Sequence, residues 1–134
     1  MSKQLALFPL SSFILPGGRM RLRVFEKRYL RVVREAGLGQ RAFAMALLNP
    51  FVTQQHKDRI LPLATEVVIE DFEQLPDGLL GITIRGVTRV EVNHRWQEDD
   101  GLHVAQVAEL ESWPVTHRNE RYADLARSLS QLLQ

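Results

Sequence analysis

Hydrophobic and polar residues change their spacing within one short stretch of the chain, between residues 19 and 37. Met20, Leu22 and Val24 alternate with arginines, which is typical of a strand with one buried face. The apolar residues that follow have the spacing of one helical face, and they are Phe25, Tyr29, Val32, Val33 and Ala36. The pattern therefore predicts a strand at 19–24 that leads directly into a short helix, which Gly37 is placed to end.

Other segments have the alternation or the apolar content of strands, namely residues 5–10, 42–48, 65–75, 80–96 and 102–110. Residues 42–48 are almost entirely apolar, which predicts a central strand covered on both faces. Residues 51–61 are mostly polar and are expected to form a loop. Residues 76–78 and 98–101 have the composition of hairpin turns, and Gly86 marks a bend or a bulge. Short strands separated by turns predict a closed or nearly closed β-barrel.

The end of the chain, residues 116–134, has the pattern of a helix with a single apolar stripe, formed by Tyr122, Leu125, Leu129, Leu132 and Leu133. One barrel wall is not expected to cover this stripe. We therefore expect a second copy of the chain or another protein to bury it, and a homodimer through this helix is the first expectation.

Length and composition are those of one ordinary globular domain, with 45% hydrophobic and 25% charged residues among 134. The chain has no cysteine, which excludes disulfides, thiolate nucleophiles and cysteine-bound metals and suits a reducing compartment. It also lacks a signal-peptide pattern and an apolar run of membrane-spanning length. We therefore expect a cytoplasmic protein.

Three short motifs occur in a defined order along the first 30 residues: Leu-Phe-Pro-Leu at 7–10, Pro-Gly-Gly at 16–18 and Val-Phe-Glu-Lys-Arg-Tyr at 24–29. Together with a later Gly-x-x-Arg at 86–89, this set resembles the N-terminal substrate-recognition (LON) domain of Lon-type ATP-dependent proteases. It is especially similar to stand-alone proteins that carry this domain without the ATPase or the protease. The resemblance covers about residues 5–115.

The resemblance implies an α+β, mainly β fold: a PUA-like pseudobarrel of about six strands with one inserted helix and a C-terminal helix. It divides the chain into a barrel domain at 1–115 and a terminal helix at 116–134. In the family a helical subdomain follows the barrel, so this last helix would be the first part of a subdomain that is cut short.

Enzymatic chemistry is not indicated by any motif. The chain has no phosphate-binding loop, and neither its serines nor Lys3, Lys27 and Lys57 lie in a context that resembles the Ser–Lys protease site. The histidines His56, His94, His103 and His117 lack metal-ligand spacing; His94 is expected to be partly buried, and His103 and His117 to lie at the surface. We expect no catalytic residue, no cofactor and no metal. Glu26, Arg28 and Tyr29 are interpreted as architectural, with Arg28 or Arg89 pairing with Glu26.

Charge is unevenly distributed, because residues 19–34 carry seven cations and one anion in a chain of net charge +1. A candidate basic patch therefore consists of Arg19, Arg21, Arg23, Lys27, Arg31 and Arg34. It could bind RNA through a PUA-like barrel, or it could be the solvated outer face of a strand and helix. The carboxylates of Glu70, Asp71 and Glu73 are expected to protect a strand edge.

The leading hypothesis is a non-enzymatic module that engages unfolded polypeptide or a partner protein, as the resemblance implies. Such recognition requires exposed apolar surface. The candidate polypeptide-binding residues lie on the loops and the hairpin, and they are Phe13, Ile14, Phe51, Val52, Phe72 and Leu75. Burial of each in the barrel is the alternative. RNA binding and a purely structural, self-associating role are the competing functions.

Overall fold

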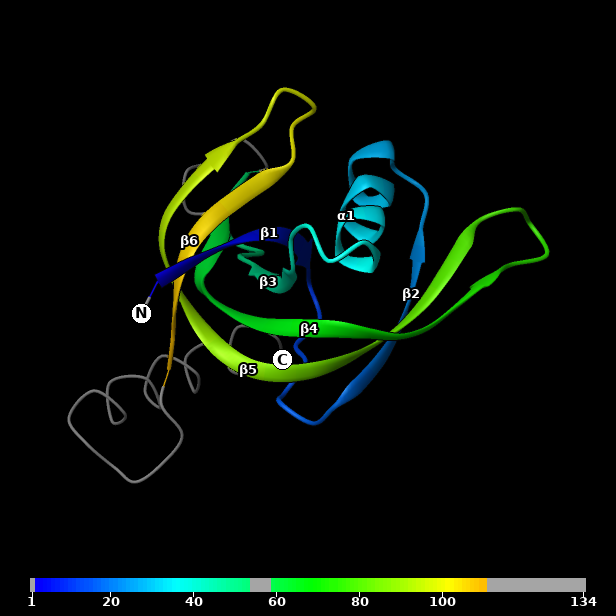
Figure 1. Cartoon of the computed structure of the whole chain (residues 1–134). Helices are drawn as coiled ribbons and strands as arrows, with labels where there is room; N and C mark the ends of the chain where they lie inside the picture. Colours follow the sequence, from blue (N-terminus) through cyan, green and yellow to red (C-terminus); the bar gives the residue numbers. More distant parts are fainter. Residues whose placement is uncertain (1, 54–58, 111–134) are drawn as a thin grey trace.

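The computed structural model describes residues 2–53 and 59–110. The described elements are β1 (Ser2–Leu10), β2 (Arg19–Val24), α1 (Lys27–Gly37), β3 (Phe43–Leu48), β4 (Ile60–Gln74), β5 (Leu80–Gln97) and β6 (His103–Glu109) (Figure 1). The predicted helix at 116–134, the domain boundary near residue 115 and the dimer contact all lie outside the described residues.

Five of the strands form a ring. β1 pairs in parallel with β3 and antiparallel with β6, while β3 pairs with β4, β4 with β5, and β5 with β6. The order β1–β3–β4–β5–β6 therefore returns to β1, and β2 is added outside it, on the first half of β5. Figure 1 shows these strands curving around a shared interior. The prediction of a mainly β, nearly closed barrel with an inserted helix is confirmed for the described part.

The two longest strands extend beyond the ring. Residues 68–74 of β4 and 80–85 of β5 pair with each other, and β2 pairs with the other edge of this part of β5. We call this three-stranded unit, with its connecting turn at 75–79, the arm. Its hairpin projects from the body of the molecule in Figure 1. The β4–β5 pairing shifts register twice where the two strands leave the ring: Val87 is the extra residue in β5, and Glu70 is the extra residue in β4. Such extra residues bend a strand locally.

The predicted alternation in β2 is confirmed. Leu22 and Val24 are buried, and Arg19, Arg21 and Arg23 are exposed. The assignment of Phe25 to the buried helix face is wrong, because α1 begins at Lys27 and Phe25 precedes its first turn with 65% of its surface exposed. At the other end, Gly37 is the last helical residue, and Gly39 supplies the left-handed backbone, with φ +73°.

The central strand β3 is buried on both faces, as its apolar composition predicts. The loop predicted for residues 51–61 is too long, since β4 begins at Ile60. Ile60 and Leu63 are buried on either side of the exposed Pro62. Proline lacks the N–H that a central strand needs, and it therefore conceals this strand start in the sequence.

The loop between β1 and β2 is bound to the middle of β5 at Gly86. Gly17 N donates to Gly86 O over 2.8 Å, and Gly86 N donates to Gly18 O over 2.9 Å. A Cβ atom at Gly86 would lie only 2.3 Å from the carbonyl oxygen of Leu15. The glycine thus permits a close backbone crossing beside the extra residue Val87 of β5, in agreement with the predicted bulge.

Candidate functional site

The outer face of the arm carries a ladder of ion pairs. Arg19 Nε lies 2.6 Å from Glu70 Oε1, Arg21 Nη2 lies 2.7 Å from Glu73 Oε1, and Arg23 pairs with Asp77. These pairs connect β2 to β4 and its turn across the intervening strand β5. Gly81 of β5 is the register partner of both Arg23 on β2 and Glu73 on β4. Because Gly81 has no side chain, the side chain of Leu75 fits beside it; a Cβ atom at Gly81 would lie only 3.1 Å from Leu75.

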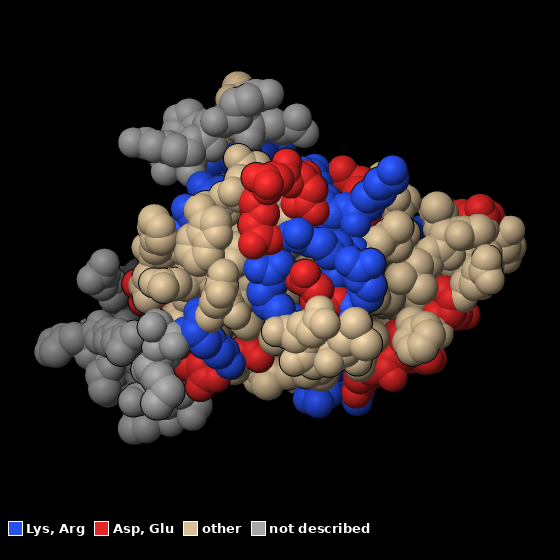
Figure 2. All heavy atoms as spheres, turned by 45° about the horizontal axis from the view of Figure 1, so that its top comes forward, with Lys and Arg blue, Asp and Glu red and all other residues tan. Residues whose placement is uncertain are grey.

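The ladder changes the interpretation of the basic patch. The hydrogen bond from Arg19 is the main cause that lowers the pKa of Glu70, and Arg85 adds to it from 3.1 Å. Arg31 on α1 is likewise paired, with Glu98 and with Asp100. Figure 2 accordingly shows basic and acidic side chains intermingled over the visible face. Four of the six candidate cations are neutralised, whereas Lys27 and Arg34 have no ion-pair partner among the described residues.

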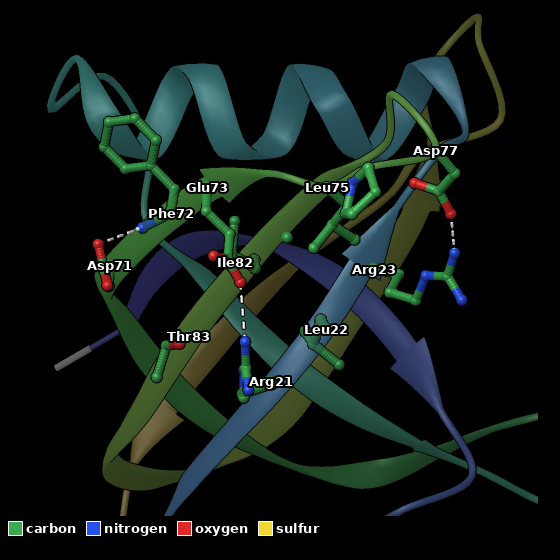
Figure 3. Close-up of a pocket in the computed structure, with 12 residues that line it drawn as sticks. Arg21, Leu22, Arg23, Asp71, Phe72, Glu73, Leu75, Asp77, Ile82 and Thr83 are labelled. Carbon is green, nitrogen blue, oxygen red and sulfur yellow. Dashed lines mark hydrogen bonds and ion pairs between the residues drawn. The ribbon is translucent and has the colours of Figure 1, made fainter.

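A hollow of about 690 Å³ lies on this charged side of the arm (Figure 3). Its walls include the Arg21–Glu73 and Arg23–Asp77 pairs, and its apolar lining includes Leu22, Leu75 and Ile82. The carboxylate oxygen Oδ1 of Asp71 accepts a hydrogen bond from the backbone N–H of Phe72, and Asp71 forms no ion pair with another described residue. This hollow combines a modest apolar lining with two ion pairs and the carboxylate of Asp71.

A second hollow, of about 770 Å³, lies between α1 and β4 and is more apolar. Its apolar lining comes mainly from two elements that the fold brings together, α1 with Leu30, Val33 and Ala36 and β4 with Val68, Ile69 and Phe72, and Leu80 of β5 adds to it. Phe72 keeps 71% of its surface exposed and Leu30 keeps 38%. We call this the helix–arm groove. Phe72 is also among the residues that line the outer hollow.

Comparison with known proteins supports a single assignment. The chain matches the family model of the ATP-dependent protease La (LON) substrate-binding domain over residues 4–134. The chain belongs to the LON substrate-binding domain family.

A crystal structure of a Lon N-terminal domain protein from Xanthomonas campestris is 33% identical, with a TM-score of 0.72, and the match covers 98% of this chain and 76% of that one. The N-terminal domain of the Mycobacterium avium complex Lon protease has the same fold at 14% identity and a TM-score of 0.65, with 96% of this chain and 68% of that chain covered. Comparison with curated protein sequences gives no significant match. The resemblance to LON domains that the motifs indicate is confirmed. The family match accounts for residues 4–134, which contain neither the ATPase nor the protease domain of Lon.

The fold separates the predicted binding residues of this LON domain. Phe72 and the half-buried Leu75 lie on the arm, whereas Phe51, 70% exposed, and Val52 follow β3 and line neither hollow. The prediction that Ile14 offers exposed apolar surface for binding is wrong, because Ile14 is only 5% exposed. Its carbonyl oxygen accepts a 2.8 Å hydrogen bond from the buried Thr65 hydroxyl. Phe13 is half-buried against the cluster of Leu47 and Leu63.

Sequence reasoning missed the contribution of α1 to the groove. Leu30 lies off the apolar stripe of the helix, and an isolated exposed leucine is ordinary in a soluble protein. Leu30 and Phe72 lie far apart in the sequence, and only the folded chain places both in the lining of one groove. Glu26 and Arg28 do pair with each other, at 3.1 Å, as one of the two predicted arrangements requires.

The described part of the LON domain gathers no three His, Asp or Glu side chains in the manner of a metal site. No helix within the same ranges is long and apolar enough to cross a membrane. His94 is exposed on β5, so the expectation that it is partly buried is wrong. His103 is partly buried at the start of β6, contrary to its predicted surface position, and its Nδ1 lies 3.3 Å from Nη1 of Arg95.

His103 should make the LON domain less stable in mild acid. Burial lowers its pKa to about 4, and the nearby charges of Arg95 and Arg28 add to the effect. The unfolded chain takes up this proton below about pH 6.5, whereas the folded chain does so only near pH 4, so stability falls as the pH drops through that interval. We expect a loss of about 1–2 kcal/mol, since partial exposure reduces the effect.

Urea unfolding of the parent and of His103→Gln at several pH values measures this contribution. The variant should lose part of the dependence of stability on pH between about 6.5 and 4. Identical pH profiles for the two proteins would contradict the burial of a neutral imidazole.

Proposed function

We propose that this domain is a non-enzymatic module that binds apolar segments of unfolded polypeptide in the helix–arm groove. The observation that carries the proposal is that two exposed apolar side chains, Leu30 and Phe72, line the same predominantly apolar groove. Water-exposed apolar surface of this kind is stabilised when another apolar group covers it. The family description, a substrate-binding domain, supports the same class of function.

The groove also has the dimensions and chemistry of a peptide site. A volume of about 770 Å³ accommodates several side chains, and two different elements supply its walls. Asp71 lies on the β4 wall and Arg34 on the α1 wall, so each side of the apolar lining has a charge that can contact the peptide backbone or a polar side chain. Apolar contacts would supply most of the affinity, and the charges would supply orientation.

RNA binding by the basic patch is the alternative function, and it starts from the PUA-like pseudobarrel that the resemblance implies. The ion-pair ladder argues against it, because Arg19, Arg21 and Arg23 already have carboxylate partners. RNA would have to displace these partners or bind beside their negative charges. We therefore place polypeptide binding first.

The test is binding of a fluorescently labelled, unfolded protein such as denatured casein, measured by fluorescence anisotropy. Phe72→Ser should weaken binding by about tenfold or more, because a phenyl ring that covers bound apolar surface contributes about 1.5–3 kcal/mol. Phe51→Ser is the matched control, since Phe51 and Phe72 have nearly equal exposed fractions, 70% and 71%, and only Phe72 lines the groove.

Equal losses in the two variants, or a loss in Phe51→Ser alone, would contradict the groove as the binding site. Raising the salt concentration from about 50 to 200 mM should leave casein binding nearly unchanged. A labelled single-stranded RNA in the same assay tests the alternative, because RNA binding through several phosphates would be strongly salt-dependent. Tight RNA binding without casein binding would reject the proposal.

A further inference from the structure

A third hollow lies at one end of the ring and is separate from the helix–arm groove. It has a volume of about 490 Å³. The ends of β1, β3 and β5, the beginnings of β4 and β6, and the Phe-Glu-x-Arg-Tyr motif after β2 all contribute to its lining. We call it the barrel mouth. Ligands commonly bind in the mouths of β-barrels because several strands end there together.

The charges of the barrel mouth do not balance. Arg28 Nη2 lies 3.1 Å from Glu26 Oε1, and Arg23 is paired with Asp77. Arg59 instead uses Nη1 to donate to two backbone carbonyls, those of Asn49 at 2.8 Å and of Val52 at 3.2 Å. Among the described residues no carboxylate forms an ion pair with Arg59, so a lining guanidinium keeps its positive charge without an anionic partner.

The rest of the lining is largely apolar or aromatic. Leu10, Val24, Leu48 and Ile60 contribute aliphatic surface, and Phe8 and Tyr29 stack with their ring centroids 4.4 Å apart. His103, with a pKa of about 4, is uncharged at neutral pH and adds a neutral polar group. A ligand that satisfies this lining must combine one negative charge with an apolar body.

We propose that the barrel mouth binds a free carboxylate carried on an apolar residue, as at the C-terminus of a polypeptide. This inference rests on the proposed polypeptide-binding function and adds a second contact point for the same class of ligand. The Arg59 guanidinium is the carboxylate-binding group, since its planar fork matches the two oxygens of a carboxylate. The aliphatic lining receives the side chain of the terminal residue.

Replacement of Glu26 should change carboxylate affinity in the opposite direction to replacement of Arg59. Its carboxylate lines the same hollow and repels an incoming anion, while it also occupies Arg28. Glu26 precedes α1 without making a side-chain cap hydrogen bond to the helix, so its amide counterpart should fold normally. Glu26→Gln should therefore strengthen carboxylate binding, whereas Arg59→Gln should weaken it.

The experiment compares two labelled apolar peptides of identical sequence, one with a free C-terminal carboxylate and one with a C-terminal amide, by fluorescence anisotropy. The parent should bind the free acid about tenfold more tightly, the typical effect of one charge-assisted pair. Arg59→Gln should abolish that preference, and Glu26→Gln should enlarge it. Thermal unfolding of each variant verifies that it is folded.

Equal affinity for the acid and the amide in the parent would overturn this inference. The proposed groove function would survive that result if Phe72→Ser still weakened both peptides equally. Competition by N-acetyl-leucine, with N-acetyl-leucinamide as the control, separates the possible sources of the carboxylate. Competition by the acid alone supports the carboxylate site and shows that a small molecule suffices, whereas competition by both compounds equally contradicts it.

Discussion

Replacement of Gly86 by alanine is expected to destabilise the domain by about 3 kcal/mol or more. The added Cβ would lie 2.3 Å from the carbonyl oxygen of Leu15, 3.0 Å from its carbonyl carbon and 3.2 Å from Cα of Pro16. All three atoms belong to the backbone, so no flexible side chain can move aside. The loop must shift away from β5, and two hydrogen bonds of 2.8 and 2.9 Å between the segments weaken with it. Urea unfolding measures the loss.

Gly37→Ala is the matched control for this prediction. No atom lies within 4 Å of a Cβ built at Gly37, which is the last helical residue of α1, and alanine should be neutral or stabilising there by up to about 1 kcal/mol. If Gly86→Ala were as stable as Gly37→Ala, that result would contradict the close approach of the loop backbone to β5 at Gly86.

Leu22→Glu is expected to unfold the domain or to destabilise it by about 4 kcal/mol or more. Leu22 is 8% exposed on the inner face of β2, and the described residues around it in the core are apolar. A carboxylate at this position would lose its water without gaining a cationic partner. Loss of the cooperative unfolding transition, measured by circular dichroism, would be the clearest result.

Arg21→Glu is the control at the neighbouring position on the opposite face. It breaks the ion pair with Glu73, in which the Arg21 side chain is 77% exposed and the Glu73 side chain 54% exposed. Loss of so exposed a pair should lower the free energy of unfolding by no more than about 1 kcal/mol. The double variant Arg21→Glu with Arg23→Glu should also remain folded, although the new carboxylates repel Glu73 and Asp77. Comparable destabilisation on both faces would mean that the arginines support the fold through the ladder.

Local patterns predicted the elements well where the spacing of apolar residues matches their burial. The alternation through Leu22 and Val24 corresponds to the buried face of β2, and the apolar run in β3 corresponds to burial on both faces of that strand. Errors occurred where the period changes or is interrupted. Phe25 continues the helical spacing but precedes the helix, and Pro62 masks the beginning of β4 between two buried residues.

The candidate site was less accessible to sequence reasoning, because its parts are distant in the chain. Arg19 and Glu70 are separated by 51 residues, and their pairing depends on the register of two strands on either side of β5. Because of this register, the arginines expected to form a basic patch on β2 are instead paired with carboxylates of β4 and its turn. Among the candidate apolar residues, composition could not distinguish Ile14, which the Thr65 hydrogen bond holds inside, from Phe72, which remains in water.

The closure of the ring has a consequence for the order in which the chain can fold. β1 is synthesised first, yet its two partners are β3 and β6, and the ion pair from Lys3 to Glu109 spans 106 residues. A nascent chain that has not yet exposed residues 103–109 carries the apolar run from Leu5 to Phe8 with one strand edge open. Such long-range pairing slows folding and leaves an aggregation-prone edge during synthesis. The interval between the emergence of β1 and of β6 from the ribosome is therefore the period in which this strand edge is open to pairing with another chain.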